Sequence, residues 1–429
     1  MATTEASDSV SQVEPTHGAV ESYSDAWAPF DQQTAADAAL LSGELSILRQ
    51  RLGAFPNNRT PRSFSSGEAA GLIGVSDGYL RQLSLSGEGP QPSHISQTRR
   101  RAYSLEDVNA LRVHLAAQGG PKAKQYVPHR NPSDGEQLQI LTVANLKSGS
   151  GKTTTATHLA QYMALQGYRV LAIDLDPQAA MSGLLGSQPE LASHPNTSIY
   201  DAVRYDAERV PLNSVIVETC FAGLHLSPGS LKLQEFDHLT PLNLAMGSQE
   251  NSRFEEELFF TRVRAAIISV AHNYDIAILD CPPHLGFLTL SALCAATSVI
   301  LPVHPSMLDL SAMSEFLSMV TDLLSIVRER GGEPASSYLR YLVTDYEPND
   351  GPQTQIVAFL RAQFGERVLT APMVKSTAIS DAALINRTLY ETGRQTLSRA
   401  IYDRAMESLT SVNSEIEDLV KANWGRSVR

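Results

Sequence analysis

Short apolar runs alternate with helical patterns along the C-terminal two thirds of the chain. From about residue 136 onward, the runs are separated by longer stretches in which apolar positions recur every three or four residues. Short apolar runs are typical of buried strands, and their alternation with helices is typical of a parallel α/β sheet. We therefore expect strands at residues 138–144, 169–173, 224–227, 276–279, 298–303, 338–343 and 367–370.

The first 55 residues have a different pattern. Residues 1–33 are rich in Ser, Thr, Glu and Asp, and we expect them to form a disordered tail. Residues 34–55 have an apolar stripe at helical spacing, formed by Leu41, Leu45 and Leu48 with neighbouring leucines. Such a helix packs on its own domain or against a second copy of the chain, and the pattern favours neither arrangement.

Residues 56–118 predict a small module of short helices. Ser65 and Glu68 form a capping-box pattern that opens a first helix at residues 68–73, and Ser76 can cap a second helix at residues 77–83. This spacing is typical of a helix-turn-helix, whose second helix enters the DNA major groove. The expected DNA contacts are the exposed positions of that helix and the arginines that follow it: Tyr79, Arg81, Gln82, Arg99, Arg100 and Arg101. The alternative is a helical adaptor with solvated arginines.

Composition and length narrow the class of protein. The 429 residues suffice for two or three domains, and 42% hydrophobic with 19% charged residues is ordinary for a globular chain. No run approaches the roughly 18 apolar residues of a membrane span, and the acidic start does not resemble a signal peptide, so we expect no membrane partner. The cysteines, Cys220, Cys281 and Cys294, lack metal-site spacing and fit a reducing cytoplasm.

The net charge of −12 is unevenly distributed. Residues 1–55 have two Lys/Arg and eight Asp/Glu, whereas residues 56–130 have ten Lys/Arg and five Asp/Glu. A basic bias confined to residues 56–130, which include the small module, suits DNA binding. Residues 119–135 begin with Gly-Gly-Pro, end at Gly135 and contain two further prolines, so we predict that they form a linker. A C-terminal domain would then occupy residues 136–429.

A phosphate-binding loop is the strongest chemical signal. Residues 138–155 read as a strand, a Gly/Ser turn and a helix start, where backbone N–H groups can converge on anionic oxygens. Lys152 can reach the outer phosphates, and the Thr153 hydroxyl can bind Mg²⁺. The residues expected to surround the nucleotide are Lys147, Ser148, Gly149, Ser150, Gly151, Lys152, Thr153 and Thr154.

Acidic residues follow two further strands. Asp174 and Asp176 lie at the end of the strand at 169–173, and Asp280 ends the strand at 276–279. Ligands of open α/β sheets bind beyond the carboxyl ends of the strands, so these carboxylates lie where a ligand is expected. A hard cation such as Mg²⁺ needs oxygens of this kind. Asp309 and Glu315, which follow the strand at 298–303, we interpret as helix surface.

These elements together resemble the ParA/MinD ATPases, whose deviant Walker A motif has a second lysine, here Lys147. Ser148 replaces the motif's first glycine. The resemblance implies an α/β P-loop NTPase fold with a mostly parallel sheet flanked by helices, preceded by a helical dimerisation segment and a winged helix-turn-helix. It implies ATP and Mg²⁺ as cofactors, Asp176 orienting the attacking water and Lys147 reaching ATP of the partner subunit. Pro372 and Met373 would enclose adenine.

The small module resembles the winged helix-turn-helix of MerR-type regulators, in which arginines before a Tyr-Ser pair contact DNA backbone. With the ATPase part, the chain resembles plasmid-partition ParA proteins, most closely the RepA proteins of RepABC plasmid operons. That resemblance implies slow, DNA- and partner-stimulated ATP hydrolysis, a homodimer, a ParB/RepB-type partner, autorepression of its operon and a cytoplasmic, nucleoid-associated location. A MinD-like positioning ATPase and a nucleotide-responsive transcription regulator without a segregation role are the alternatives.

Overall fold

The computed structural model describes residues 29–51, 59, 61–95, 100–120, 123–187, 197–247, 258–332, 338–392 and 398–427. Its contacts divide the chain into two units at Gly53. The first unit contains one described helix, α1 (Phe30–Arg51), which confirms the helical pattern expected from residue 34. The leucines of its apolar stripe, among them Leu41, Leu45 and Leu48, are exposed within this unit. Most of the expected tail lies outside the described residues.

The second unit is built on a seven-stranded sheet, whose order is β10-β9-β4-β8-β5-β7-β6. All neighbouring pairs are parallel except β6 with β7. The strands are β4 (Gln139–Val143), β5 (Val170–Asp174), β6 (Val217–Glu218), β7 (Leu224–Ser227), β8 (Ile276–Asp280), β9 (Ser298–Val303) and β10 (Tyr338–Val343). Six of the expected strands are therefore confirmed, and the mostly parallel α/β fold with them.

The strand expected at residues 367–370 is wrong. Only a single bridge joins Val368 to Tyr341 of β10. The N–H groups of Thr370 and Ala371 instead donate to the carboxylate of Glu415, at 2.7 and 2.9 Å. A side chain thus takes the hydrogen bonds that a further strand would have used.

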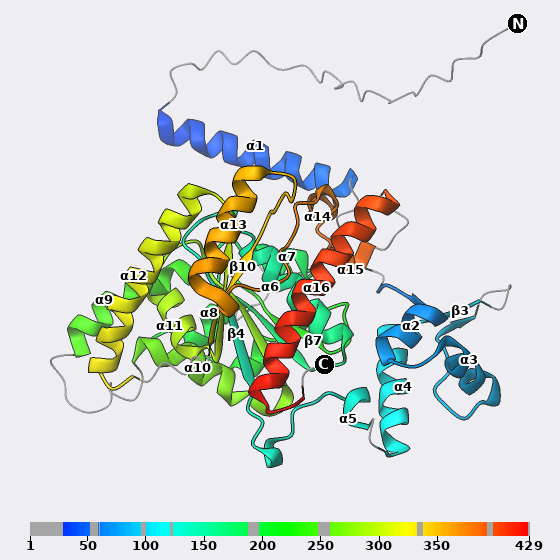
Figure 1. The fold of residues 1–429 in the computed structure, drawn as a ribbon. Coiled ribbons are helices and arrows are strands. Elements are labelled where there is room, and N and C mark those ends of the chain that lie inside the picture. The colour runs from blue at the N-terminus through cyan, green and yellow to red at the C-terminus, as the bar shows by residue number, and fades with distance from the viewer. Residues whose placement is uncertain are drawn as a thin grey trace, which may run out of the picture. The chain divides into compact units, whose positions relative to one another are not determined.

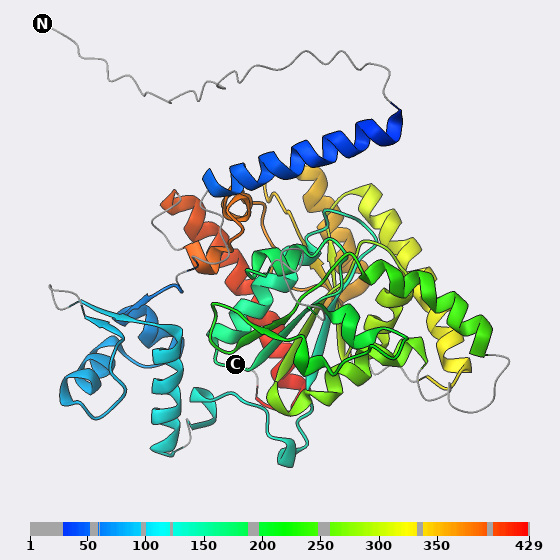
Figure 2. The same cartoon turned by 180° about the vertical axis from the view of Figure 1, so that it is seen from behind.

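Helices cover both faces of the sheet (Figures 1 and 2). Alternate strand residues such as Leu141 and Ile278 pack with α6 (Lys152–Leu165) and α16 (Arg399–Asn423). Their neighbours, such as Ile140 and Leu279, pack with α10 and α11 on the other face. After the phosphate-binding loop and α6, the described residues also form α7 (Ala180–Leu184), α8 (Ile199–Val203), α9 (Leu233–Gly247), α10 (Phe259–Ser269), α11 (Phe287–Ala295), α12 (Met307–Glu329), α13 (Gly351–Phe364), α14 (Thr377–Leu384) and α15 (Leu389–Thr392).

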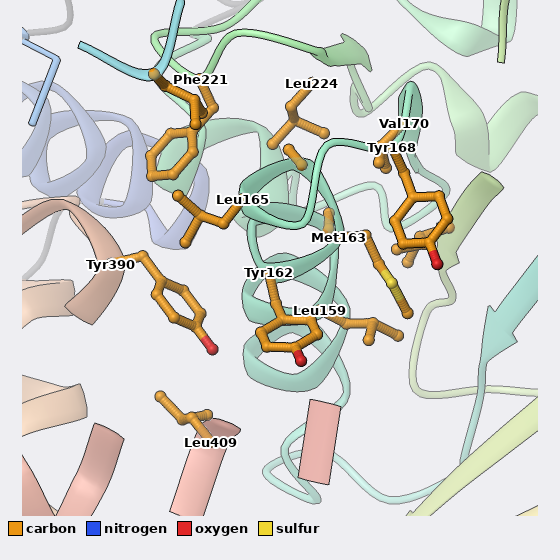
Figure 3. Close-up of a cluster of buried hydrophobic side chains, with 14 of the residues drawn as sticks. Leu159, Tyr162, Met163, Leu165, Tyr168, Val170, Phe221, Leu224, Tyr390 and Leu409 are labelled. Carbon is orange, nitrogen blue, oxygen red and sulfur yellow. The ribbon is translucent and has the colours of Figure 1, made fainter. Parts of the chain in front are cut away.

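Helix α6 is enclosed on nearly every side (Figure 3). Leu159 and Met163 are fully buried, and Tyr162 packs in the same cluster as Leu409 of α16 and Tyr390 of α15. Polar side chains of α6, among them Thr157, His158 and Gln161, are buried as well, so the helix has almost no solvated face. The helix that follows the phosphate-binding loop is therefore held in place by the side chains packed around it, including those of α15 and α16.

The small module contains α2 (Ser66–Ile73), α3 (Asp77–Ser86), α4 (Leu105–Ala117) and a sheet with the order β1-β3-β2. Its strands are β1 (Phe64–Ser65), β2 (His94–Ile95) and β3 (Arg101–Tyr103), all antiparallel. The capping box of Ser65 and Glu68 is confirmed by reciprocal hydrogen bonds, and Ser76 caps α3. The helices expected at 68–73 and 77–83 are thus present and slightly longer.

The core of the module is continuous with the core around α6. Arg112 of α4 is 3% exposed and donates to the carbonyl oxygen of Leu165, in the last turn of α6, at 2.5 Å. It also donates to the carbonyl of Leu72 in α2 at 2.8 Å. Burial lowers the pKa of Arg112 to about 10. One cation therefore joins two module helices to the negative end of α6.

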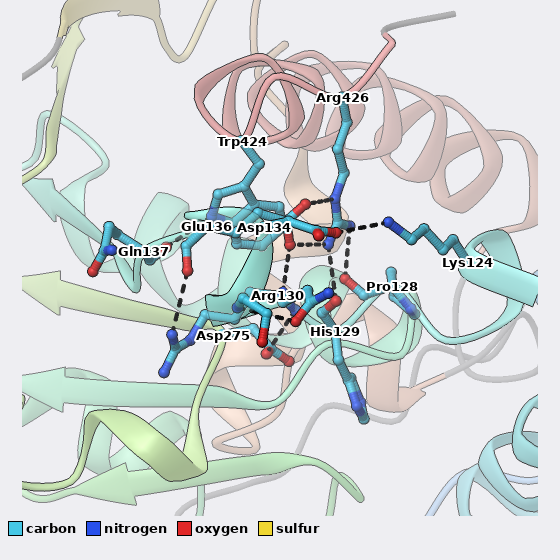
Figure 4. Close-up of polar contacts among 12 residues, drawn as sticks. Lys124, Pro128, His129, Arg130, Asp134, Glu136, Gln137, Asp275, Trp424 and Arg426 are labelled. Atoms are coloured by element: carbon cyan, nitrogen blue, oxygen red, sulfur yellow. Dashed lines mark hydrogen bonds and ion pairs between the residues drawn. The ribbon is translucent and has the colours of Figure 1, made fainter.

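Residues 119–135, expected as a linker, contain α5 (Ala123–Tyr126) and a short 3-10 turn, Pro132–Asp134. Polar contacts tie this segment to both the sheet and the C-terminal end (Figure 4). Arg426 donates to the carboxylate of Glu136 and to the carbonyl oxygens of Pro128 and His129, all at 2.7–2.8 Å. Arg130 donates to the carbonyl of Tyr274 at 2.8 Å. The segment is thus pinned along its length.

Helix α12 is long and apolar enough to be a candidate membrane span by length and composition alone. The sequence predicts no membrane span, because no uninterrupted apolar run approaches roughly 18 residues. In the structure α12 follows β9 and packs along the sheet, while Met307 and Leu308 at its start are exposed.

Candidate nucleotide site

The phosphate-binding loop joins β4 to α6 at the carboxyl edge of the sheet. Gly149 and Gly151 have φ angles of 77° and 86°, a region that glycine enters without strain. Thr344, at the end of β10, donates its hydroxyl to the carbonyl of Ser150 at 2.8 Å. Sequence reasoning did not single out Thr344, which fastens the loop to a neighbouring strand end. The first turn of α6 opens directly behind this loop, with its N–H groups at the loop.

Lys152 is the first residue of α6 and is only 7% exposed. Its ammonium group donates to the carbonyl of Lys147 at 2.8 Å, across the loop. Burial lowers the pKa of Lys152, while the nearby carboxylates of Asp280 and Asp176 act in the opposite direction. A largely buried cation therefore lies inside the loop, where an anionic group would complete its coordination.

Asp280 ends β8, which runs between β4 and β5. The register pairs Asp280 with Val143 at the start of the loop and with Asp174 of β5. Asp280 is fully buried, and neither of its carboxylate oxygens has a hydrogen-bond partner in the described part of the chain. Burial and the charge of Asp174 raise its pKa well above the usual range. A divalent cation is the kind of group that satisfies such an orphaned carboxylate.

Asp174 has a different environment from Asp280. One oxygen accepts from the N–H of Asp176 at 3.1 Å, and the other accepts from the N–H and hydroxyl of Ser182 at 2.8 and 2.7 Å. Burial raises its pKa to about 6, against the effect of these hydrogen bonds. Asp174 is thus occupied in holding the loop to α7, which favours support of the metal site over direct ligation.

The loop after β5 places Asp176 beside this support. One Asp176 carboxylate oxygen accepts from the N–H of Gln178 at 2.9 Å, and the residue is 8% exposed. A side chain at Gly229 would meet the Asp176 carbonyl at 2.8 Å. The adjoining Ala179 has a φ of 52°, which is uncommon for a residue with a side chain. Close approach by Gly229 thus shapes this loop, and the sequence pattern gave no signal for it.

Lys147 is paired within its own chain. Its ammonium group donates to Asp309 at 2.5 Å, in the first turn of α12. Asp309 is 2% exposed, so our interpretation of it as helix surface is wrong. The error arises because a helix pattern does not reveal which first-turn position faces a neighbouring loop.

Of the two residues expected to contact adenine, Met373 is buried and Pro372 is partly exposed. Met373 is 4% exposed, and its side chain belongs to the apolar core cluster around α6. The backbone N–H of Met373 donates to Val343 at 2.8 Å. Pro372 is half-buried, and its carbonyl accepts from the Ser408 hydroxyl at 3.0 Å. Only Pro372 of the pair therefore offers side-chain surface.

Of the expected DNA contacts, three lie on α3 of the small module, Arg101 begins β3 and Arg100 directly precedes it. Arg99 lies outside the described residues. Tyr79, Arg81 and Gln82 are exposed on α3. Arg81 forms an exposed ion pair with Asp77 at 2.7 Å, and such pairs are readily exchanged for other partners. Arg101 donates to the Ser84 hydroxyl at 3.0 Å, so part of its role is to hold β3 against α3. Arg100 is exposed.

The parallel sheet, the loop with its buried lysine and the orphaned Asp280 define a P-loop nucleotide-binding protein. Among the residues that the structure describes, no group of three or more His, Cys, Asp or Glu side chains has metal-site geometry.

Comparisons with known proteins agree with this class. Residues 138–330 match the family described as AAA domain. A Rhizobium rhizogenes protein, provisionally named replication protein A, is 48% identical over 91% of this chain and 94% of its own length. Protein SopA of Escherichia coli K12 is 30% identical over 85% and 90%. A solved structure titled Partition Protein has a TM-score of 0.60 at 20% identity, covers 91% of this chain and 99% of its own, and shares the fold.

The chain belongs to the ParA-type family of partition ATPases, and its relatives include RepA-like replication proteins of rhizobia.

Proposed function

We propose that the chain is an Mg²⁺-dependent ATP hydrolase that acts in DNA segregation. The observation that carries this proposal is the convergence of buried Lys152 with the orphaned carboxylate of Asp280 beside the glycine loop. Lys152 and the loop N–H groups would hold the phosphates, while Thr153 and Asp280 would hold Mg²⁺. Phosphoryl transfer requires positioning and charge stabilisation more than a covalent nucleophile, and this arrangement supplies both.

Asp176 would orient the attacking water. Its loop is fixed by Asp174, Ser182 and Gly229, so its carboxylate has a defined position at the edge of the sheet. When bound, Mg²⁺ would neutralise charge that develops on the transferred phosphoryl group.

Two dimer contacts are part of the proposal. Lys147 would donate to the phosphates of ATP held by a second subunit, because Lys152 already serves the phosphates of its own. Helix α1, whose apolar stripe is exposed within its unit, would pair with α1 of a second copy. The first contact depends on ATP, and the second does not.

The small module would bind operator DNA, with Tyr79, Arg81 and Gln82 of α3 in the major groove and Arg99, Arg100 and Arg101 at the backbone. Its two helices, joined at the left-handed Gly74, and the adjoining small sheet support this proposal. Repression of its own operon would follow from operator binding. We further propose a ParB/RepB-type partner that stimulates hydrolysis, non-specific DNA binding by the ATP-bound dimer, and action in the cytoplasm at the nucleoid.

Phosphate release by the full chain tests the proposal, measured with ATP, with and without Mg²⁺ and with and without DNA. We expect turnover that requires Mg²⁺ and rises when DNA is added. Tight ATP binding with no turnover under any of these conditions would instead support the nucleotide-responsive regulator that does not hydrolyse ATP. Lack of ATP binding would reject the site itself.

A further inference from the structure

Asp309 holds the Lys147 ammonium group from a deeply buried position. One oxygen accepts from Lys147 at 2.5 Å and from the hydroxyl of Ser306, the residue that caps α12. The other oxygen is buried and has no hydrogen-bond partner among the described residues. The Asp309 side chain is 1% exposed, whereas that of Lys147 is 41% exposed. The carboxylate is thus inside the protein, and the cation lies at its surface.

Two roles are compatible with this pair. Asp309 could restrain Lys147, which would then have to leave before it reached a second subunit. Alternatively, Asp309 could keep Lys147 in place while the lysine makes its contact. Departure of Lys147 would leave the buried Asp309 carboxylate without its cation, and a buried charge without a partner costs several kcal/mol. Release of Lys147 is therefore the less favourable route.

The lysine can serve both partners at once. An ammonium group has three N–H donors, and Asp309 uses one of them. The 41% exposure of Lys147 leaves the remaining side of the group open to an anion from outside the subunit. This shared arrangement resembles the Lys–Glu pair of protein kinases, in which the lysine also contacts phosphate.

We propose that Asp309 is a positioning residue that holds Lys147 toward the phosphates of the second subunit during hydrolysis. The inference rests on the proposed function, in which Lys147 acts across the dimer. Asp309 acts only through Lys147, and the ion pair stays formed when ATP is bound.

The test is a double-mutant cycle in the full chain with Asp309→Asn, Lys147→Gln and both together. For Asp309→Asn we expect ATP affinity within about twofold of wild type and turnover reduced about tenfold, because Lys152 is unchanged while Lys147 loses its position. In the Lys147→Gln background, Asp309→Asn should have no further effect. Asp322→Asn, the same change at an exposed position of α12, is the matched control and should behave as wild type.

Asp309→Glu keeps the charge and keeps the test decisive if the Asn variant does not fold. It should retain more turnover than Asp309→Asn, or than Asp309→Ala. Faster turnover by Asp309→Asn would support the restraining role and overturn the proposal, as would turnover equal to wild type. An added loss of turnover in the Lys147→Gln background would show that Asp309 acts by stabilising α12 and not through Lys147. A wild-type chain that binds ATP without turnover would reject the proposed function and this role with it.

Discussion

Charged side chains are buried at the nucleotide edge of the sheet but exposed in the small module. At the nucleotide edge, Lys152, Asp280 and Asp309 are almost completely buried. In the module, the polar side chains expected to meet DNA, such as Arg81 and Gln82, are exposed on α3. Buried charges need specific partners, because desolvation is costly, whereas exposed charges are already satisfied by water.

This difference shows where structure alone can indicate a ligand. The unpartnered Asp280 carboxylate and the lysine inside the loop are incomplete without a cation and an anion, so they point to Mg²⁺ and phosphate. Exposed arginines are complete without DNA. The case for the module therefore depends on helix arrangement and charge, and substitutions there should have smaller and more additive effects.

Lys152→Ala should have the largest effect. Loss of a buried cation on the phosphates should weaken ATP affinity at least about 100-fold, and hydrolysis should be lost with it. Isothermal titration with ATP and Mg²⁺ measures this. Lys232→Ala, an exposed lysine of the same domain, is the control. Unchanged ATP affinity in Lys152→Ala would contradict the assignment of the loop.

Asp176→Ala should reduce ATP hydrolysis without weakening ATP binding. Its carboxylate contacts water in the proposed reaction, so ATP affinity should persist while turnover falls about 100-fold. The ATP-bound dimer should then accumulate, which light scattering can detect. Normal turnover by this variant would show that another group orients the water.

His158, inside α6, should make stability depend on pH. Burial lowers its pKa from 6.5 to about 4, and its neutral ring contacts the Thr154 carbonyl and the Leu389 N–H. The unfolded chain binds this proton near pH 6.5, and the folded chain binds it only near 4. The contribution of His158 to stability should therefore fall by about 3 kcal/mol as pH drops through that interval.

Urea unfolding at several pH values between 7 and 4 tests this dependence. His158→Gln should flatten it, whereas His94→Gln at an exposed position of β2 should not. The same slope in wild type and His158→Gln would exclude His158 as the cause.

Substitutions in the module should have the smallest effects. Arg100→Ala should lower the slope of log affinity against log salt by about 0.9, with little change in sequence preference. Gln82→Ala should instead relax specificity at one base pair by about 1–3 kcal/mol. Fluorescence anisotropy with operator DNA measures both, and Arg328→Ala on α12 is the control. Operator binding that survives combined loss of Arg81, Gln82 and Arg100 would show that the small module does not recognise the operator.

Much of the fold and of the nucleotide site can be predicted from the sequence, because the signals for them lie within short stretches of the chain. The order of strands, the glycine loop and the acids after β5 and β8 are each set by short stretches, and capping residues such as Ser65 mark helix starts. Partners distant in sequence are different. Asp309 with Lys147, Gly229 with Asp176, and Thr344 with Ser150 come together only through the parallel order of strand ends. The contacts that fix Pro128 and Arg130 in the predicted linker could not be predicted either, because their partners lie at Arg426 and Asp275.

The central claim is that Lys147 completes the nucleotide site of a second subunit. The most direct measurement is ATP turnover by purified heterodimers of Lys147→Gln with Asp176→Ala, isolated through two different tags. Each homodimer should retain only residual turnover, about 100-fold below wild type for Asp176→Ala. In the heterodimer, one pocket keeps Asp176 and receives Lys147 from its partner, so we predict about half of wild-type turnover from the two-fold arrangement. A heterodimer as inactive as both parents, although assembled and able to bind ATP, would contradict the account.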